Sequence, residues 1–192
     1  DDRRALQQWF ATYLRWLRES PNGQHEHRAR NNHGSWYGAQ TAALALYAGD
    51  TALARTIVAE ALPRIGRQIM PDGQQPIELE RTRSFHYSAF NAEALSRLAE
   101  MGRHVGVDVW GYEAPEGGSL RRALDHVARY LPEPEKWPGK QIDAIHLDEM
   151  IIHLRRGNAA FAGAPYADAL RRLPAEEVRT NRSALLYPDA PG

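Results

Sequence analysis

The chain has 192 residues, 24 Lys and Arg against 24 Asp and Glu, and no cysteine. This length favours one domain with a real core, and the balanced charge gives no argument for a nucleic acid or an anionic membrane as a partner. The lack of cysteine excludes disulfides and thiol catalysis, and no apolar run approaches the roughly 18 residues of a membrane span.

Apolar residues recur at helical spacing along most of the chain, and no pair of strands is convincing. The pattern predicts an all-α fold of helices joined as hairpins. Within the third helix, Pro63 predicts a kink or an early end. The helices are expected over residues 3–19, 36–48, 51–69, 85–102, 119–131, 141–155 and 159–173.

Turn-forming residues separate these helices. Ser20-Pro-Asn-Gly23 predicts a helix stop, and residues 25–34 are expected to be a polar loop. The segment 74–84 has no helical period and is expected to be extended. We assign residues 1–173 to one domain and residues 174–192 to a polar, proline-bearing tail.

Two polar clusters stand where a loop enters a predicted helix. The first is Arg28-Ala-Arg-Asn-Asn-His-Gly-Ser-Trp-Tyr37, and the second is Glu78-Leu-Glu-Arg-Thr-Arg-Ser-Phe-His-Tyr-Ser88. Both are rich in amide, imidazole and guanidinium groups, which donate hydrogen bonds to anions. Two such entries on successive helices predict a cleft that recognises an anion.

The two clusters also carry a family resemblance. Through Asn31-Asn-His-Gly-Ser-Trp-Tyr37 and Glu78-Leu-Glu-Arg-Thr-Arg-Ser-Phe-His-Tyr-Ser-Ala-Phe-Asn91, the chain resembles the alginate-lyase-like polysaccharide lyases over roughly residues 10–145. The resemblance implies an incomplete (α/α) toroid that cleaves 1,4-linked uronate polymers such as alginate or glucuronan by β-elimination, without a metal or organic cofactor. It also implies a periplasmic or secreted location.

The members of that family are about twice as long as this chain, which opens inside a helical pattern. We therefore expect a mature or trimmed product that corresponds to the C-terminal half of the toroid. A half-toroid exposes apolar helix faces, so self-association is expected.

The resemblance assigns roles to particular residues. Asn32 and His33 match the family's Asn–His pair at the uronate carboxylate. Arg81 matches the arginine that precedes the catalytic tyrosine, with Arg83 as the alternative, and Tyr87 matches the tyrosine itself. The remaining substrate-binding candidates are Asn31, Trp36, Gln40, His86 and Trp137.

The chemistry explains why such residues are needed. Removing the C5 proton of a uronate places a second negative charge beside the carboxylate, so the site must neutralise that carboxylate, and Asn32, His33 and Arg81 fit this role. In mannuronate and glucuronate the C5 proton and O4 lie on one face of the ring, so Tyr87 alone can serve both. In guluronate they lie on opposite faces, which makes His33 the base and Tyr87 the acid. A tyrosine hydroxyl titrates at about 10 in water, so a catalytic tyrosine needs positive charge nearby.

Other interpretations of the same residues remain open. Asn31 is also a good helix N-cap, with Ser35 as the alternative cap, and Tyr87 could be an ordinary surface aromatic. His25, His27 and His33 suggest a metal site, but the His-x-His spacing is a weak signal, and Glu26 is expected to point away on an extended segment.

The two acidic residues Glu78 and Glu80 suggest a second enzyme class. They could form a glycosidase pair, but no carboxylate stands across from them, so Glu78 is expected to orient Arg81 or His33 instead. The alternatives to a lyase are therefore a glycoside hydrolase on a related barrel, or an inactive or carbohydrate-binding fragment of the toroid.

Overall fold

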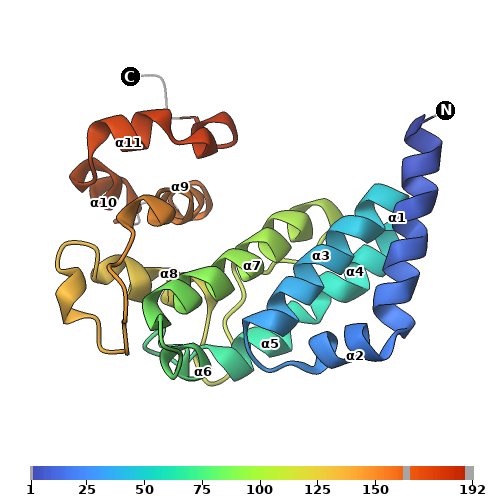
Figure 1. Cartoon of the computed structure of the whole chain (residues 1–192), viewed down its shortest axis with the longest axis horizontal. Helices are drawn as coiled ribbons and strands as arrows, with labels where there is room; N and C mark the ends of the chain where they lie inside the picture. Colours follow the sequence, from blue (N-terminus) through green and yellow to red (C-terminus); the bar gives the residue numbers. More distant parts are fainter. Residues whose placement is uncertain (1, 162–164, 189–192) are drawn as a thin grey trace.

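The computed structural model describes residues 2–161 and 165–188, and these residues are built from helices and loops (Figure 1). Within them the backbone forms no strand, only isolated bridges between Arg83 and Gln141 and between Glu113 and Ser119. The all-α prediction is confirmed. The helices are α1 (Asp2–Glu19), α2 (Pro21–Arg28), α3 (Asn32–Ala48), α4 (Thr51–Ala59), α5 (Ala61–Gln68), α6 (Pro76–Leu79), α7 (Ser84–Val105), α8 (Leu120–Arg129), α9 (Ile151–Ala160), α10 (Tyr166–Arg172) and α11 (Ala175–Thr180), with 3-10 turns at Pro134–Lys136, Leu147–Met150 and Arg182–Leu185.

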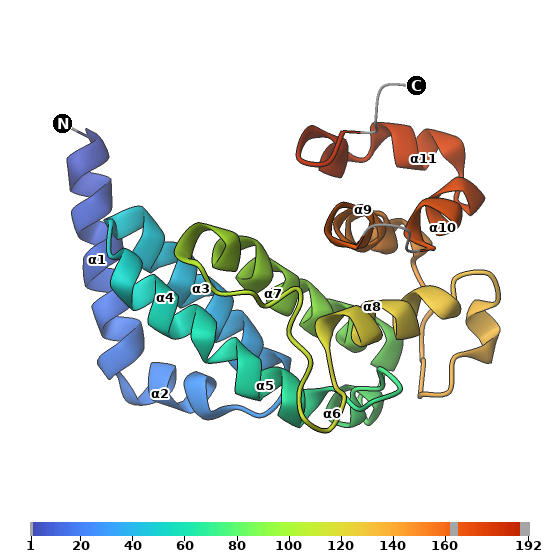
Figure 2. The same ribbon diagram turned by 180° about the vertical axis from the view of Figure 1, so that it is seen from behind.

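Helix α3 lies at the centre of the N-terminal part and packs against α1, α4 and α7. Figures 1 and 2 show these helices side by side, with α9, α10 and α11 gathered in a separate group at the other end of the molecule. Ala42 and Ala45 on α3 and Leu95 and Ala99 on α7 are completely buried. Small side chains at this contact let the two backbones approach closely, which fixes the spacing of the two helices that carry the polar clusters.

Helix α2 was not predicted, and the cause is its first turn. The Ser20 hydroxyl accepts a hydrogen bond from the Gly23 N–H at 3.1 Å, and Pro21 occupies the first helical position. Ser-Pro therefore starts a helix here instead of only stopping the previous one. The expected loop over 25–34 is consequently wrong for most of its length, because α2 runs to Arg28 and α3 begins at Asn32.

The interruption predicted at Pro63 is confirmed. The helix expected over 51–69 breaks at Glu60, so that α4 ends at Ala59 and α5 begins at Ala61. Proline has no N–H to donate to the carbonyl four residues earlier, here that of Ala59, and the helix is interrupted at this turn.

Two other expectations need correction. The segment 74–84 is not extended throughout, because Pro76 begins the short helix α6. Residues 141–146 are not helical: Ser84 N–H donates to the Lys140 carbonyl and Ile142 N–H to the Thr82 carbonyl, which holds this segment extended against the start of α7. Helical structure resumes only at the 3-10 turn before α9.

The C-terminal group is tied together by a buried arginine. Arg155 of α9 donates to the Ser183 hydroxyl at 2.9 Å and to the Val178 carbonyl at 2.9 Å, so α11 and the last 3-10 turn pack on α9 although they lie in the segment expected as a tail. The single helix expected over 159–173 is divided between α9 and α10, and its residues 162–164 lie outside the described residues.

Helix α1 leaves part of its apolar face exposed. Leu6, Trp9 and Trp16 keep half or more of their surface open to solvent. Exposed apolar residues of this size are consistent with the expectation of self-association, which stays a prediction. In the described part of the chain, no helix combines the length and the apolar character that crossing a membrane requires.

Candidate active site

A cleft of about 870 Å³ opens along α3 and α7 and includes the residues that lead into each helix. It brings together six of the sequence-predicted residues: Asn32, His33, Trp36, Gln40, Arg81 and Tyr87. They come from two parts of the sequence that meet because α3 and α7 pack side by side. The predicted meeting of the two polar clusters is therefore observed.

Asn32 is fixed by a single carboxylate. Its backbone N–H donates to Glu78 Oε1 at 2.6 Å, and its side-chain amide donates to Glu78 Oε2 at 2.7 Å. Glu78 projects from α6, where it is only 2% exposed. An amide group carries two N–H bonds, so the contact with Glu78 uses one of them, and Asn32 lines the cleft.

The environment of Glu78 alters its protonation. Burial raises the pKa of this carboxyl above its ordinary value, while the two hydrogen bonds from Asn32 and the charges of Arg81 and His33 oppose the rise. Glu78 was expected to orient Arg81 or His33, but its hydrogen-bond partner is Asn32. The carboxylates of Glu78 and Glu80 do not form a pair around a sugar, because Glu78 is buried against Asn32 and Glu80 is exposed.

His33 has a carboxylate partner that the sequence did not reveal. Its Nδ1 lies 2.8 Å from Glu26 Oε2, and Glu26 lines the same cleft. The expectation that Glu26 points away is wrong, because residues 21–28 form α2 and turn the side chain toward α3. A carboxylate at Nδ1 favours the tautomer with a proton there, which leaves Nε2 of the neutral ring as an acceptor.

Arg81 and Tyr87 stack on each other. The guanidinium carbon of Arg81 lies 3.8 Å from the centroid of the Tyr87 ring. Arg81 leaves the turn after α6, whereas Tyr87 lies in the first turn of α7. The contact places a fixed positive charge against the face of the aromatic ring.

An aromatic wall continues the cleft from this pair. The rings of Trp36 and Phe90 are 4.7 Å apart, and the Arg97 guanidinium lies 5.3 Å from the Trp36 centroid. Gln40, exposed on α3, lines the same wall. Phe90, Arg97 and His104 also line the cleft and were not predicted. They follow Tyr87 at helical spacing on α7, and that spacing is the signal that could have found them.

Four predicted residues lie outside the cleft, and each has a structural partner. Asn31 is the N-cap of α3 and accepts the His33 N–H. Arg83 pairs with Asp143 at 3.0 Å, and His86 contacts Glu149 at 3.0 Å. Trp137 is 8% exposed and donates its indole N–H to the Ser84 hydroxyl at 2.7 Å. Stacking of Trp137 on a sugar is therefore not supported by its position, since its ring packs inside the protein.

A buried amide network supports the segment that enters α3. Gln68 donates to the carbonyls of Arg30 and Asn31 at 3.0 and 3.1 Å, and its oxygen accepts from Ser35 and Asn91. Asn91 also donates to Gln75 at 2.7 Å. These bonds connect α3, α5 and α7 and hold the segment that enters α3 in place.

The comparisons with known proteins now decide the family. Residues 1–137 match the alginate lyase family. The chain belongs to that family. No curated protein matches it.

Among solved structures, this alginate lyase family chain is similar to the crystal structure of an alginate lyase from Bacteroides ovatus, with 31% sequence identity and a TM-score of 0.87. The similarity covers 96% of this chain and 50% of the other, so the chain spans half the length of that structure. The likeness confirms the α/α toroid as the fold class.

Within the described residues, no three His, Asp or Glu side chains gather as a metal-ion site would require. The groups that the cleft does bring together are donors and proton carriers: an amide, an imidazole, a guanidinium and a phenol. Their combination is suited to binding a carboxylate and moving a proton beside it.

Proposed function

We propose that this chain cleaves a 1,4-linked uronate polymer by β-elimination and leaves an unsaturated uronate at the new end. The observation that carries the proposal is that Asn32, His33, Arg81 and Tyr87, from two separate motifs, line one cleft. Membership of the alginate lyase family and the likeness to the Bacteroides ovatus enzyme support it.

The first task of the site is to neutralise the uronate carboxylate. The Asn32 side-chain amide and the Arg81 guanidinium are the donors, and Glu78 holds that amide in place. Donors that are fixed before the reaction stabilise the charge that develops when C5 loses its proton, because they need no reorganisation.

The second task is to move two protons. On mannuronate or glucuronate, Tyr87 takes the C5 proton and gives a proton to O4 as the C4–O4 bond breaks, since both atoms are on the same face. On guluronate, Nε2 of His33 takes the C5 proton from the opposite face and Tyr87 protonates O4. The guanidinium carbon of Arg81, 3.8 Å from the centroid of the Tyr87 ring, places a positive charge beside this residue.

The test is ultraviolet detection of the unsaturated product on polymannuronate, polyguluronate, glucuronan and hyaluronan. We expect turnover on at least one polymer and its loss in Tyr87→Phe and in His33→Ala. Tyr47→Phe is the matched control, because Tyr47 is 43% exposed and does not line the cleft. Unchanged turnover in Tyr87→Phe would remove the tyrosine from the mechanism.

Binding without turnover is the alternative, since the chain spans half of the structure that it resembles. A folded chain that binds a polyuronate but releases no unsaturated product would support this alternative. A new reducing end without a double bond would indicate a hydrolase instead.

A further inference from the structure

A second concave surface, lined by other residues than the cleft, is strongly basic. It has a volume of about 520 Å³ and lies where the end of α2 and the segment 29–31 face α5. We name it the basic hollow. Its charged lining residues are His27, Arg28, Arg30, Glu60, Arg64 and Arg67.

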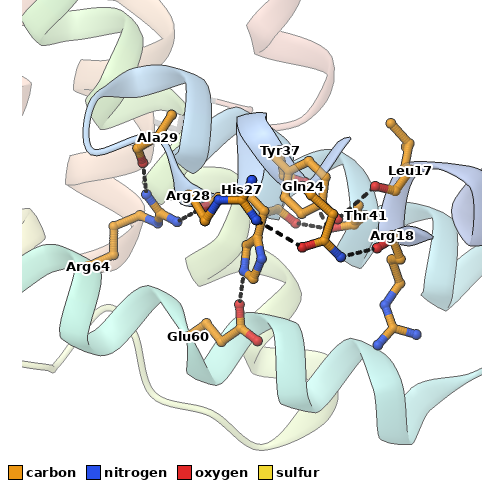
Figure 3. Close-up of polar contacts among 11 residues, drawn as sticks. Leu17, Arg18, Gln24, His27, Arg28, Ala29, Tyr37, Thr41, Glu60 and Arg64 are labelled. Atoms are coloured by element: carbon orange, nitrogen blue, oxygen red, sulfur yellow. Dashed lines mark hydrogen bonds and ion pairs between the residues drawn. The ribbon is translucent and has the colours of Figure 1, made fainter. Parts of the chain in front are cut away.

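Positive charge in the basic hollow is not balanced by its own lining. Glu60 is the one carboxylate among the described lining residues, and it already contacts His27 at 2.8 Å (Figure 3). The four arginines therefore face the hollow with no carboxylate left for them.

The arginines of the hollow differ in how they are held. Arg64 donates to the carbonyls of Ala29 and His27 at 2.9 and 3.1 Å and so closes the end of α2 (Figure 3). Burial and the nearby charge of Arg67 lower the pKa of Arg64. Arg28 contacts the Gln24 amide oxygen at 3.3 Å, whereas Arg30 and Arg67 are exposed and make no ion pair in the described part of the chain. The guanidiniums of Arg30 and Arg67 are thus available to an incoming anion. Arg64 holds the backbone at the end of α2 in place beside them.

The hollow is next to the catalytic cleft along the chain. Arg30 lines the hollow, and Asn32 and His33, two and three residues later, line the cleft. Gln68 also lines the hollow and holds the carbonyls of Arg30 and Asn31. A polyuronate carries a carboxylate on each sugar and can present several of them at once, whereas a single sugar presents one.

From this arrangement we propose that the basic hollow is a second binding site for the carboxylates of a polyuronate, which holds the polymer outside the cleft while one of its bonds is cleaved inside it. The inference rests on the proposed function for the identity of the anion. Guanidinium groups suit this ligand because they bind carboxylates with two parallel hydrogen bonds. Their positive field also attracts an anionic chain before contact.

The test combines binding and kinetics in the double variant Arg30→Gln/Arg67→Gln. Calorimetry is performed with the polymer that the wild type binds, and we expect about tenfold weaker binding in the variant and a smaller dependence on salt. If the polymer is turned over, KM for long chains rises while kcat and the KM for a trisaccharide stay unchanged. The double variant Arg129→Gln/Arg172→Gln is the charge-matched control, since these exposed arginines lie on α8 and α10 and line neither surface.

The binding arm separates this inference from the proposed function. A chain that binds polyuronate without cleaving it, and loses that binding in Arg30→Gln/Arg67→Gln, supports the second site even though the lyase proposal fails. Equal affinity in the wild type and in this variant would overturn the second site. Binding of inorganic phosphate but of no polyuronate would also overturn it.

Discussion

Asn32 gives both its backbone N–H and its side-chain amide to the carboxylate of Glu78, at 2.6 and 2.7 Å. The two residues are 46 positions apart and are both buried, so this contact joins the start of α3 to α6 beneath the cleft. One carboxylate thereby sets the position of the loop and the direction in which the Asn32 amide faces. The proposed role of Asn32 at the substrate therefore depends on Glu78.

The first prediction follows for Glu78→Gln. A glutamine has one acceptor oxygen where Asn32 supplies two donors, so one buried donor loses its partner, at a cost of about 1–3 kcal/mol. We expect kcat/KM to fall by about tenfold or more while circular dichroism stays that of the wild type. Glu80→Gln is the control, because Glu80 follows α6 but is exposed. Equal kcat/KM in the two variants would contradict the role given to Glu78.

The pH dependence gives a second prediction for the same residue. Because burial raises the pKa of Glu78, the folded chain favours the protonated form more than the unfolded chain does. Its contribution to stability is therefore complete below the pKa of an unfolded glutamate and is lost as the pH rises through the raised folded pKa. Activity is expected to rise with pH over the same range, because both oxygens of Glu78 accept from Asn32 only when the carboxyl is ionised.

Unfolding free energy and kcat/KM are measured against pH in the wild type and in Glu78→Gln. We expect the free energy of unfolding of the wild type to fall relative to that of Glu78→Gln as the pH rises. The fall of kcat/KM at acid pH should occur in the wild type and not in Glu78→Gln. An acid limb that persists in the variant would assign this titration to another group.

A third prediction concerns Glu26 as the residue that positions His33. In Glu26→Ala, Nδ1 of His33 loses its partner at 2.8 Å and the imidazole is no longer held in one tautomer. We expect kcat on polyguluronate to fall by about tenfold, with little change in KM and a smaller loss on polymannuronate, where Tyr87 serves as the base.

Two further variants test whether the effect comes from orientation. Glu26→Gln keeps an oxygen that accepts from Nδ1 and should restore part of the activity. Glu19→Ala, at the exposed end of α1, should behave as the wild type. An equal loss on both polymers would indicate a general structural role for Glu26.

The all-α class and four residues of the cleft could be predicted from the sequence. Apolar spacing predicted α1, α3 and α7, and the two motifs placed Asn32, His33, Arg81 and Tyr87 at helix entries that the structure brings into one cleft. These features depend on local patterns, namely periodicity and short motifs, which a single sequence records.

The contact partners of these residues could not be predicted from the sequence. Glu26 was assigned to a loop because Ser20-Pro21 was interpreted as a stop, whereas the hydroxyl caps α2 and the proline begins it. The Glu78–Asn32 contact depends on how α6 docks beneath α3, and no local pattern encodes that. Trp137 is similar: the sequence identifies an aromatic side chain but not the direction in which its ring packs.

The last prediction concerns the contact between the C-terminal group and the cleft. Arg156 of α9 is 3% exposed, and its guanidinium lies 3.2 Å from Glu100 and 3.6 Å from Glu93 of α7. Burial alone would raise the pKa of Glu93, but the hydrogen bond from Arg97 and the charges of His153, Arg97 and Arg156 lower it overall. Glu93 therefore contributes stability above the pKa of an unfolded glutamate and loses it as the pH falls.

Arg156→Met keeps much of the side-chain volume but leaves these carboxylates with less compensating charge. We expect a loss of about 2 kcal/mol in the free energy of unfolding at neutral pH, measured with urea, and a smaller loss as acid protonates Glu93. Arg172→Met removes an exposed arginine and should change stability by less than about 0.5 kcal/mol. Equal urea midpoints for Arg156→Met and Arg172→Met at neutral pH would mean that the contact between α7 and α9 does not stabilise the protein.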